Sequence, residues 1–243
     1  MLTRIFTIFV VAMLALPFAG ATPPVRGGTL FPDEATQPVR ASLQIPDEAA
    51  PSLAAKRKKK KPTFITVTRT VRELVTRTFS NPGAITIPAI DNASPYPSAI
   101  NVGGLVNGAI TDVNLTLNTF SHTQPVDVDV LLVPAQLPGQ NAIVMSDSGN
   151  GYAATNITLT LDDQAAAGLP DGTGAGPLVS GTFKPTNPGG AVDPFPGQMP
   201  SGNSLLSVFN GGNPNGSWQL FVVDDAAADS GQFAGGWTLQ ITA

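Results

Sequence analysis

The sequence contains no cysteine and only one histidine. The absence of cysteine excludes disulfides, a catalytic Cys-His pair and a lipid-modified amino-terminal cysteine. With a single imidazole in the chain, a Ser-His-Asp triad would have to use His122, and a zinc site would lack the several His or Cys ligands that zinc prefers. His122 stands at the end of an alternating segment, in TFSHTQP, where a structural, hydrogen-bonding role is expected.

Basic residues are almost absent from the last two thirds of the chain, and glutamate is absent there too. Of the 13 Lys and Arg residues, twelve lie at or before Arg77 and only Lys184 follows. One cation and twelve Asp give residues 78–243 a formal charge of −11, whereas twelve cations and five acids give residues 1–77 a charge of +7. An acidic globular part therefore follows a basic leader, and we expect no specific nucleic acid among its partners.

Long apolar runs are also absent, except at the amino terminus. Arg4 precedes an apolar run at residues 5–18, which is too short to span a bilayer, and Ala19, Gly20 and Ala21 are small residues typical of a cleavage site. Residues 1–21 are therefore predicted to be a signal peptide, with an uncleaved membrane anchor as the alternative. We expect a secreted or periplasmic bacterial protein without a transmembrane helix after cleavage.

Residues 22–62 show no hydrophobic periodicity and are rich in Pro and Ala, which predicts a disordered linker. The linker ends in six consecutive cations, from Lys56 to Lys61. Three interpretations of this polybasic run remain open: a solvated linker end, a segment that contacts anionic surfaces such as cell-wall polymers or lipid headgroups, and a processing site for a trypsin-like protease.

Apolar and polar residues alternate with period two from Thr63 onward, which is typical of β-strands with one buried face. Residues 63–77 are predicted to form a leading β segment. Four later segments alternate more cleanly: residues 113–117, 126–133, 157–161 and 237–241. Turn sequences built from the 25 Gly and 23 Pro separate these segments.

This spacing predicts an all-β protein, an antiparallel jelly-roll-like β-sandwich over residues 78–243 that is preceded by the disordered linker. Residues 164–204 are expected to form long loops around a short strand at residues 178–183. Trp218 and Trp237 stand in the last two apolar segments, where we expect their rings to pack in the core.

The aspartates of the acidic part are candidate metal ligands. Hard oxygen ligands without His or Cys are what Ca²⁺ uses, although no EF-hand loop is present. The candidate ligands are Asp127, Asp129, Asp224, Asp225 and Asp229, and the adjacent pair Asp162 and Asp163 is a further candidate. Two alternatives remain open: these residues are the wetted face of a half-buried strand and a solvated turn, or pairs of Asp serve a small secreted hydrolase.

Two segments carry a resemblance to a known family: SHTQPVDVDVLLVPAQLPGQNAIVMSD and SVFNGGNPNGSWQLFVVDDAAADSGQFAGGWTLQIT. They resemble the P domain, also called the Homo B domain, which follows the catalytic domain in proprotein convertases and bacterial subtilisin-like proteases. The matched positions are His122, Thr123, Asp127, Asn215, Gly216, Trp218, Leu220, Val222, Asp224, Asp229, Gly231, Trp237 and Leu239. The resemblance extends over residues 78–243.

The resemblance implies a jelly-roll sandwich that is not catalytic, that stabilises or helps to fold a protease domain, and that binds calcium in some members. We expect no subtilisin-like domain ahead of the module, so proteolysis is not expected, and the turn at residues 134–139 is longer than the family's usual turn. The sequence therefore predicts a secreted, non-catalytic, calcium-stabilised module that binds or stabilises a protein, such as a protease, or a surface polymer. The alternatives are an accessory part of a serine-protease system and a small Asp-dependent secreted hydrolase.

Overall fold

The computed structural model describes residues 73–105, 108–171, 176–188 and 193–243. The predicted signal peptide, the linker with its polybasic run and most of the leading β segment lie outside these residues. In the described ranges, no helix has both the length and the hydropathy that crossing a membrane requires.

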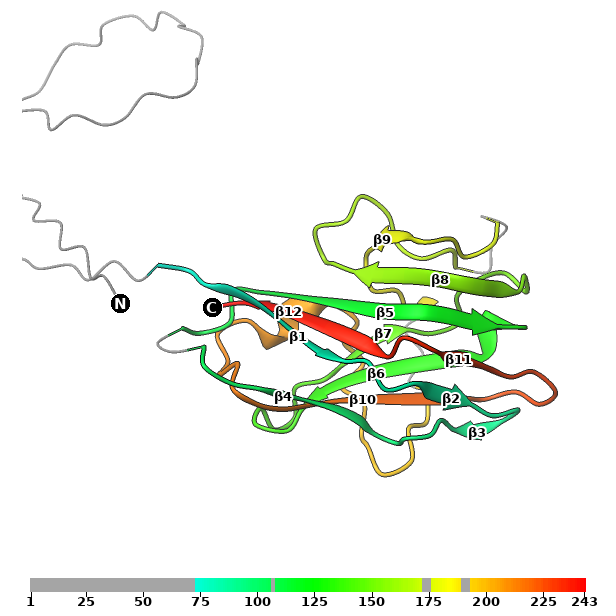
Figure 1. Ribbon diagram of the computed structural model, residues 1–243, viewed down its shortest axis with the longest axis horizontal. Helices are drawn as coiled ribbons and strands as arrows, with labels where there is room; N and C mark the ends of the chain where they lie inside the picture. Colours follow the sequence, from blue (N-terminus) through cyan, green and yellow to red (C-terminus); the bar gives the residue numbers. More distant parts are fainter. Residues whose placement is uncertain (1–72, 106–107, 172–175, 189–192) are drawn as a thin grey trace, which may run out of the picture. The chain divides into compact units, whose positions relative to one another are not determined.

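The described residues form an all-β sandwich of two sheets, as predicted (Figure 1). The seven-stranded sheet, here sheet A, contains β1 (Thr76–Asn81), β2 (Ile85–Ile87), β5 (Asp112–His122), β8 (Ala154–Leu161), β9 (Gly181–Phe183), β11 (Gly231–Phe233) and β12 (Trp237–Thr242). The five-stranded sheet, here sheet B, contains β3 (Asp91–Asn92), β4 (Ser98–Val102), β6 (Val128–Pro134), β7 (Ala142–Met145) and β10 (Gly216–Asp224). Two short 3-10 helices, η1 (Pro125–Asp127) and η3 (Leu206–Phe209), lie between strands.

Strand β5 is central to sheet A because three strands pair with it. It pairs with β12 and β11 along one edge and with β8 along the other, and in sheet B β10 pairs with β3, β4 and β6. Strand β1 pairs with β12 along its whole length, from Thr76 opposite Thr242 to Asn81 opposite Trp237. The sandwich therefore begins ahead of the predicted boundary at residue 78.

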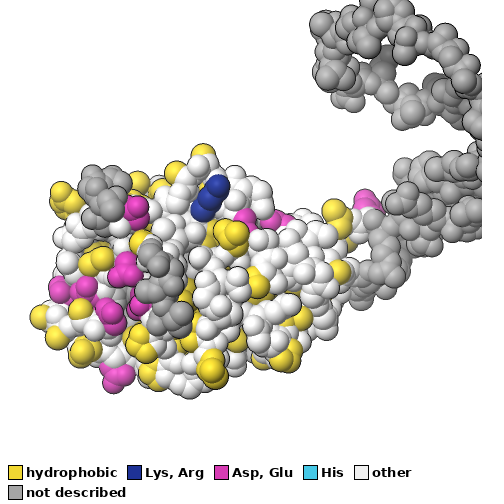
Figure 2. Space-filling view, turned by 180° about the vertical axis from the view of Figure 1, so that it is seen from behind, with side chains coloured by type: hydrophobic (Ala, Val, Ile, Leu, Met, Phe, Trp, Pro, Cys, Tyr) yellow, Lys and Arg dark blue, Asp and Glu magenta, His cyan; other side chains and the backbone are white. Residues whose placement is uncertain are grey.

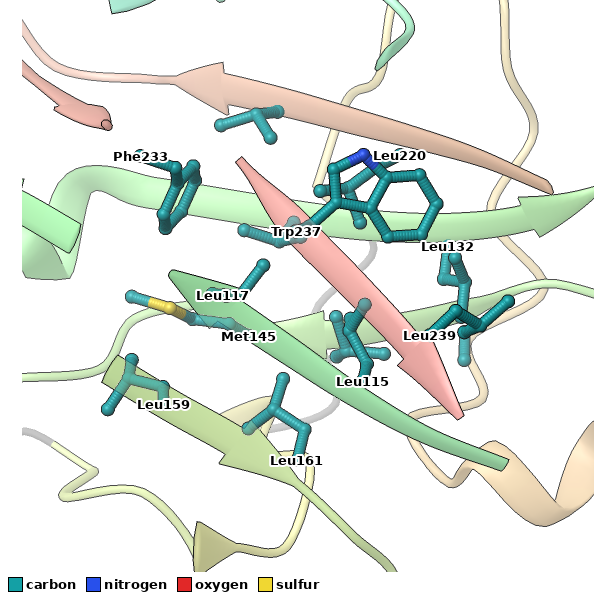
Figure 3. Packing of buried hydrophobic residues seen from close by; sticks show 14 of the residues in the cluster. Leu115, Leu117, Leu132, Met145, Leu159, Leu161, Leu220, Phe233, Trp237 and Leu239 are labelled. Carbon is teal, nitrogen blue, oxygen red and sulfur yellow. The ribbon is translucent and has the colours of Figure 1, made fainter. Parts of the chain in front are cut away.

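The alternation seen in the sequence decides which side chains face the core. Val113, Leu115 and Leu117 of β5 are at most 2% exposed, whereas the residues between them are partly exposed. Burying such a set of side chains from both sheets is the main driving force for the fold. Figure 3 shows Trp237 among leucines of both sheets, including Leu132 and Leu220.

Both tryptophans are fully buried, as predicted. Each indole N–H finds an acceptor inside the sandwich: Trp218 donates to the backbone oxygen of Pro214 at 2.9 Å, and Trp237 donates to the hydroxyl of Ser98 at 2.9 Å. Because Trp237 belongs to β12 and Ser98 to β4, the second of these bonds joins the two sheets.

One strand pair departs from the antiparallel arrangement that the sequence predicted. Strands β8 and β9 run parallel, with Leu159 opposite Gly181 and Leu161 opposite Phe183. Parallel neighbours need a long connection, and residues 162–180 provide one. The predicted strand at residues 178–183 is accordingly confined to its last three residues.

Sheet B is covered on both faces, which corrects the interpretation of Asp127 and Asp129 as the wetted face of one strand. Asp127 ends η1, and only Asp129 lies in β6, where it is 2% exposed. The outer face of β6 and its neighbours supports a second apolar cluster: Leu131, Ile143, Phe195, Phe221 and Val223, with Tyr96 and Val133 packed against it. Phe195 comes from the predicted loop region, so that loop packs on the sheet instead of leaving it in water.

The turn before β12 is tightly packed at Gly236. Its φ is +63°, and an added Cβ would lie 2.0 Å from the backbone oxygen of Asn81. Gly197 has a similar φ of +78°, but nothing lies within 4 Å of its Cβ position. We expect Gly236→Ala to lower the free energy of unfolding by about 3 kcal/mol and Gly197→Ala by about 1 kcal/mol, measured by urea denaturation. Equal losses in the two variants would show that the close contact with Asn81 does not matter.

Candidate functional site

The only histidine of the chain forms a buried pair with an aspartate of the opposite sheet. His122 is the last residue of β5 and Asp224 the last of β10, and their side chains are fully buried. The Nε2 atom of His122 lies 3.1 Å from Oδ2 of Asp224, while Oδ1 of Asp224 accepts a hydrogen bond from the backbone N–H of Ala226. The structural, hydrogen-bonding role predicted for His122 agrees with this geometry.

The hydrogen bonds of His122 fix its tautomer. Nδ1 accepts the backbone N–H of Gln124 at 3.2 Å, so this nitrogen carries no proton. Nε2 therefore carries the ring proton and donates it to Asp224. Both nitrogens are engaged, and neither is left to accept a proton from a serine in the way that a catalytic triad requires.

Two further predicted ligands, Asp229 and Asp127, lie beside this pair. Asp229 accepts a hydrogen bond from the hydroxyl of Thr123 at 2.8 Å. Asp127 is partly buried, and burial followed by repulsion from Asp224, Asp225 and Asp229 raises its carboxyl pKa. Asp224 and Asp229 are thus each bonded to a partner within the protein, and they do not converge on a shared position.

A second group of carboxylates lies close enough together for its members to repel one another; we call it the acidic cluster. It consists of Asp129, Asp147, Asp193 and Asp225. The Ser146 hydroxyl lies 2.8 Å from Oδ2 of Asp193 and 3.2 Å from Oδ2 of Asp147. Burial first, and then repulsion from Asp147, Asp193 and Asp224, raises the pKa of Asp225. Figure 2 shows acidic side chains concentrated at one end of the sandwich.

Asp129 is the member of the acidic cluster whose ionised form is least favourable. Its Oδ2 is buried and has no hydrogen-bond partner among the described residues. Burial, followed by repulsion from Asp193, raises its pKa to about 8, and the Ser146 hydroxyl opposes this rise only in part. An ionised carboxylate without a partner is costly in a protein interior, so this position favours either a bound proton or a bound cation.

The acidic cluster overlaps only in part with the predicted ligand set. It contains Asp129 and Asp225, but Asp147 and Asp193 come from a turn sequence and from a loop rich in Gly and Pro. No spacing in the sequence links those two residues to β6. Among the described residues, no three His, Cys, Asp or Glu side chains are already placed to hold one metal ion together.

Comparisons with known proteins give a limited likeness. No protein-family model and no curated protein matches the chain. Two solved structures match it: a complex of the serine protease of Aeromonas sobria with the chaperone ORF2, and a second structure of the serine protease of Aeromonas sobria. Each is 14% identical, with TM-scores of 0.35 and 0.34, and each match covers 72% of this chain but 28% of the protease chain.

Asp129→Asn is expected to change how stability depends on pH. A carboxyl whose pKa rises from about 3.9 in the unfolded chain to about 8 in the folded protein stabilises the fold fully below pH 4. That contribution is lost as the pH rises to 8. In the presence of a chelator, we expect the thermal midpoint of the native protein to fall between pH 5 and pH 8, and the fall to be clearly smaller in Asp129→Asn.

Asp162→Asn serves as the control for this measurement, because it removes one acid outside the acidic cluster. Its carboxylate is partly exposed and accepts the backbone N–H of Gln164. We expect it to retain the fall seen in the native protein. An equally steep fall in Asp129→Asn would show that Asp129 is not the group that titrates.

Proposed function

We propose that the protein is an exported, non-catalytic module of the P-domain type, which binds or stabilises a partner and is itself stabilised by Ca²⁺. The observation that carries the proposal is the buried carboxylate of Asp129, whose Oδ2 has no hydrogen-bond partner among the described residues, within a cluster of four aspartates. No Lys or Arg of the described residues forms an ion pair that could neutralise it, because the only ion pair there is that of His122 with Asp224.

The hydrogen bonds made by both ring nitrogens of His122 support a non-catalytic role. An activated serine needs a base with a free nitrogen, and His122 uses both of its nitrogens to hold β10 and the start of η1 in place. The pair also spans the two sheets, which is the position of a structural bond. The family resemblance, which implies a non-catalytic sandwich, favours the same interpretation.

The acidic cluster supplies the chemistry that Ca²⁺ prefers. Four carboxylates and the hydroxyl of Ser146 offer hard oxygen ligands, and flexible coordination by six to eight oxygens, including backbone and water, is usual for this ion. Asp147 and Asp225 are exposed, so their side chains are free to turn toward Asp129. A bound Ca²⁺ would neutralise Asp129 and hold Asp193, which is close in the chain to Phe195, against sheet B.

Calcium is expected to raise the thermal midpoint of the native protein at pH 7.5, and a chelator is expected to lower it. A ligand that binds only the folded state stabilises it by about 2.7 kcal/mol at a hundred times its Kd. Asp129→Asn and Asp193→Asn should each remove most of the response to Ca²⁺. The measurement is differential scanning calorimetry at several Ca²⁺ concentrations.

Two acids outside the cluster provide matched controls for the calcium experiment. Asp229→Asn alters a carboxylate that is bonded to Thr123, and Asp162→Asn alters one outside the cluster. Both variants should keep the full response. A native midpoint that is the same with Ca²⁺ and with chelator would exclude the calcium site.

The competing function is a small hydrolase that works through Asp pairs. It would need a carboxyl with a raised pKa, which Asp129 has, but Asp129 is only 2% exposed and lies out of reach of a substrate. We expect the full chain to hydrolyse neither a fluorescent casein nor a set of chromogenic glycosides. Hydrolysis that disappears in His122→Gln or in Asp129→Asn, with the fold retained, would refute the proposal of a non-catalytic module.

The place of action is also a proposal. The predicted signal peptide would direct the chain to a secreted or periplasmic location, and the polybasic run from Lys56 to Lys61 would contact an anionic surface there. Both segments lie outside the described residues, so these roles rest on the sequence alone. A protein partner, such as a protease, and a surface polymer are both compatible with a module held at a surface in this way.

A further inference from the structure

An open groove of about 520 Å³ crosses sheet A next to His122. Residues at one end of β2, β11, β5 and β8 line it, with Gly231 of β11 between His122 of β5 and Ile87 of β2. Its volume lies in the range of about 300–1,000 Å³ that is usual for ligand sites. The groove is a separate feature from the acidic cluster, whose four aspartates do not line it.

Polar side chains without partners line this groove. Thr86, Thr155, Ser230 and Gln232 are exposed, and none of these side chains makes a hydrogen bond to another described residue. A hydroxyl both donates and accepts a hydrogen bond, and the Gln232 amide does the same through its two ends. The groove therefore offers several free donors and acceptors to a ligand.

The lining of the groove is uncharged, although the sandwich is strongly acidic. It contains no Asp, Glu, Lys or Arg, and both nitrogens of His122 are already bonded. Asp229 directly precedes Ser230, so negative charge stands at the border of the groove. Anionic ligands are repelled by such a border, whereas a neutral ligand is not.

Backbone forms part of the floor, and an exposed aromatic residue is the chain neighbour of one lining residue. A Cβ on Gly231 would lie 2.1 Å from the backbone oxygen of Ser121, so no side chain can fill that position. Tyr152 directly precedes the lining residue Ala153 and is 56% exposed. It is the most exposed aromatic side chain among the described residues, and its ring offers a flat surface to a ligand.

The strands beside the groove are irregular. Thr119 in β5 and Asn156 in β8 have φ angles of 53° and 52°, which are uncommon for residues with a Cβ, and the pairing of the two strands shifts register here. The Ser121 hydroxyl is held by Asn156, accepting its backbone N–H at 2.8 Å. Bulges and positive φ angles of this kind are concentrated next to binding sites, where they re-aim side chains.

We propose that this groove binds a neutral glycan chain, with Tyr152 against a sugar ring and with Thr86, Thr155, Ser230 and Gln232 bonded to its hydroxyls. A glycan offers many hydroxyls and no charge, as this lining requires. An extended peptide instead adds to a free strand edge, and the strands here already pair with one another. The inference rests on the binding role proposed above but not on the calcium site.

The test is affinity electrophoresis of the full chain in gels that contain a soluble β-glucan or a soluble mannan, followed by calorimetric titration with the polymer that slows migration. We expect at least one of these polymers to slow the native protein. Tyr152→Ala and Gln232→Ala should each weaken binding by threefold to tenfold, which corresponds to about 0.7–1.4 kcal/mol. Tyr152→Phe, which keeps the ring, should bind nearly as the native protein does.

Met199→Ala is the matched control, because Met199 is 89% exposed and does not line the groove. Thermal midpoints with and without Ca²⁺ are measured on the same samples. A folded native protein that neither polymer slows, or binding that both Tyr152→Ala and Gln232→Ala leave unchanged, would overturn the glycan site. If the response to Ca²⁺ persists in that case, the calcium proposal stands while the glycan proposal fails.

Discussion

The buried hydrogen bond between His122 and Asp224 holds the two sheets together at the end of the sandwich where both candidate sites lie. His122 ends β5 and lines the groove, and Asp224 ends β10 directly before Asp225 of the acidic cluster. The loss of either partner would leave a polar group unsatisfied in a closed interior, at a cost of about 3 kcal/mol or more. The geometry of both sites therefore depends on one pair that takes no part in binding itself.

The acidic cluster shows a conflict between packing and electrostatics. Apolar contacts around Phe195 close the outer face of sheet B, and this closure removes Asp129 from water. The same closure brings Asp193 close enough to repel Asp129 and raise its pKa. A proton or a cation resolves the conflict without disturbing the apolar contacts, so stability at this end of the molecule is sensitive to the solution in a way that the core is not.

Most of the fold was predictable because the alternation of apolar and polar residues within a strand shows which face of that strand is buried. Residues 113–117 and 237–241 alternate cleanly, and both segments are strands with the expected face inward. The outer cover of β6 was not predictable, because it depends on Phe195, far along the chain in a region without a pattern. The sequence identifies Asp129 as a candidate ligand. Its burial was not predictable, because that burial depends on the same outer cover. Asp147 and Asp193 gave no signal beyond their charge, since only the fold brings them to β6.

The scarcity of cations has a further consequence for resistance to proteolysis. Trypsin-like enzymes cut after Lys or Arg, and a following proline blocks the cut. Beyond Arg77 the only such residue is Lys184, and Pro185 follows it. Arg77 in β1 is therefore the last residue of the sandwich after which this class of enzyme can cut, even when the protein unfolds, whereas the run from Lys56 to Lys61 offers several such bonds. An encounter with such an enzyme would cut the chain at or before Arg77 and leave residues 78–243 in one piece.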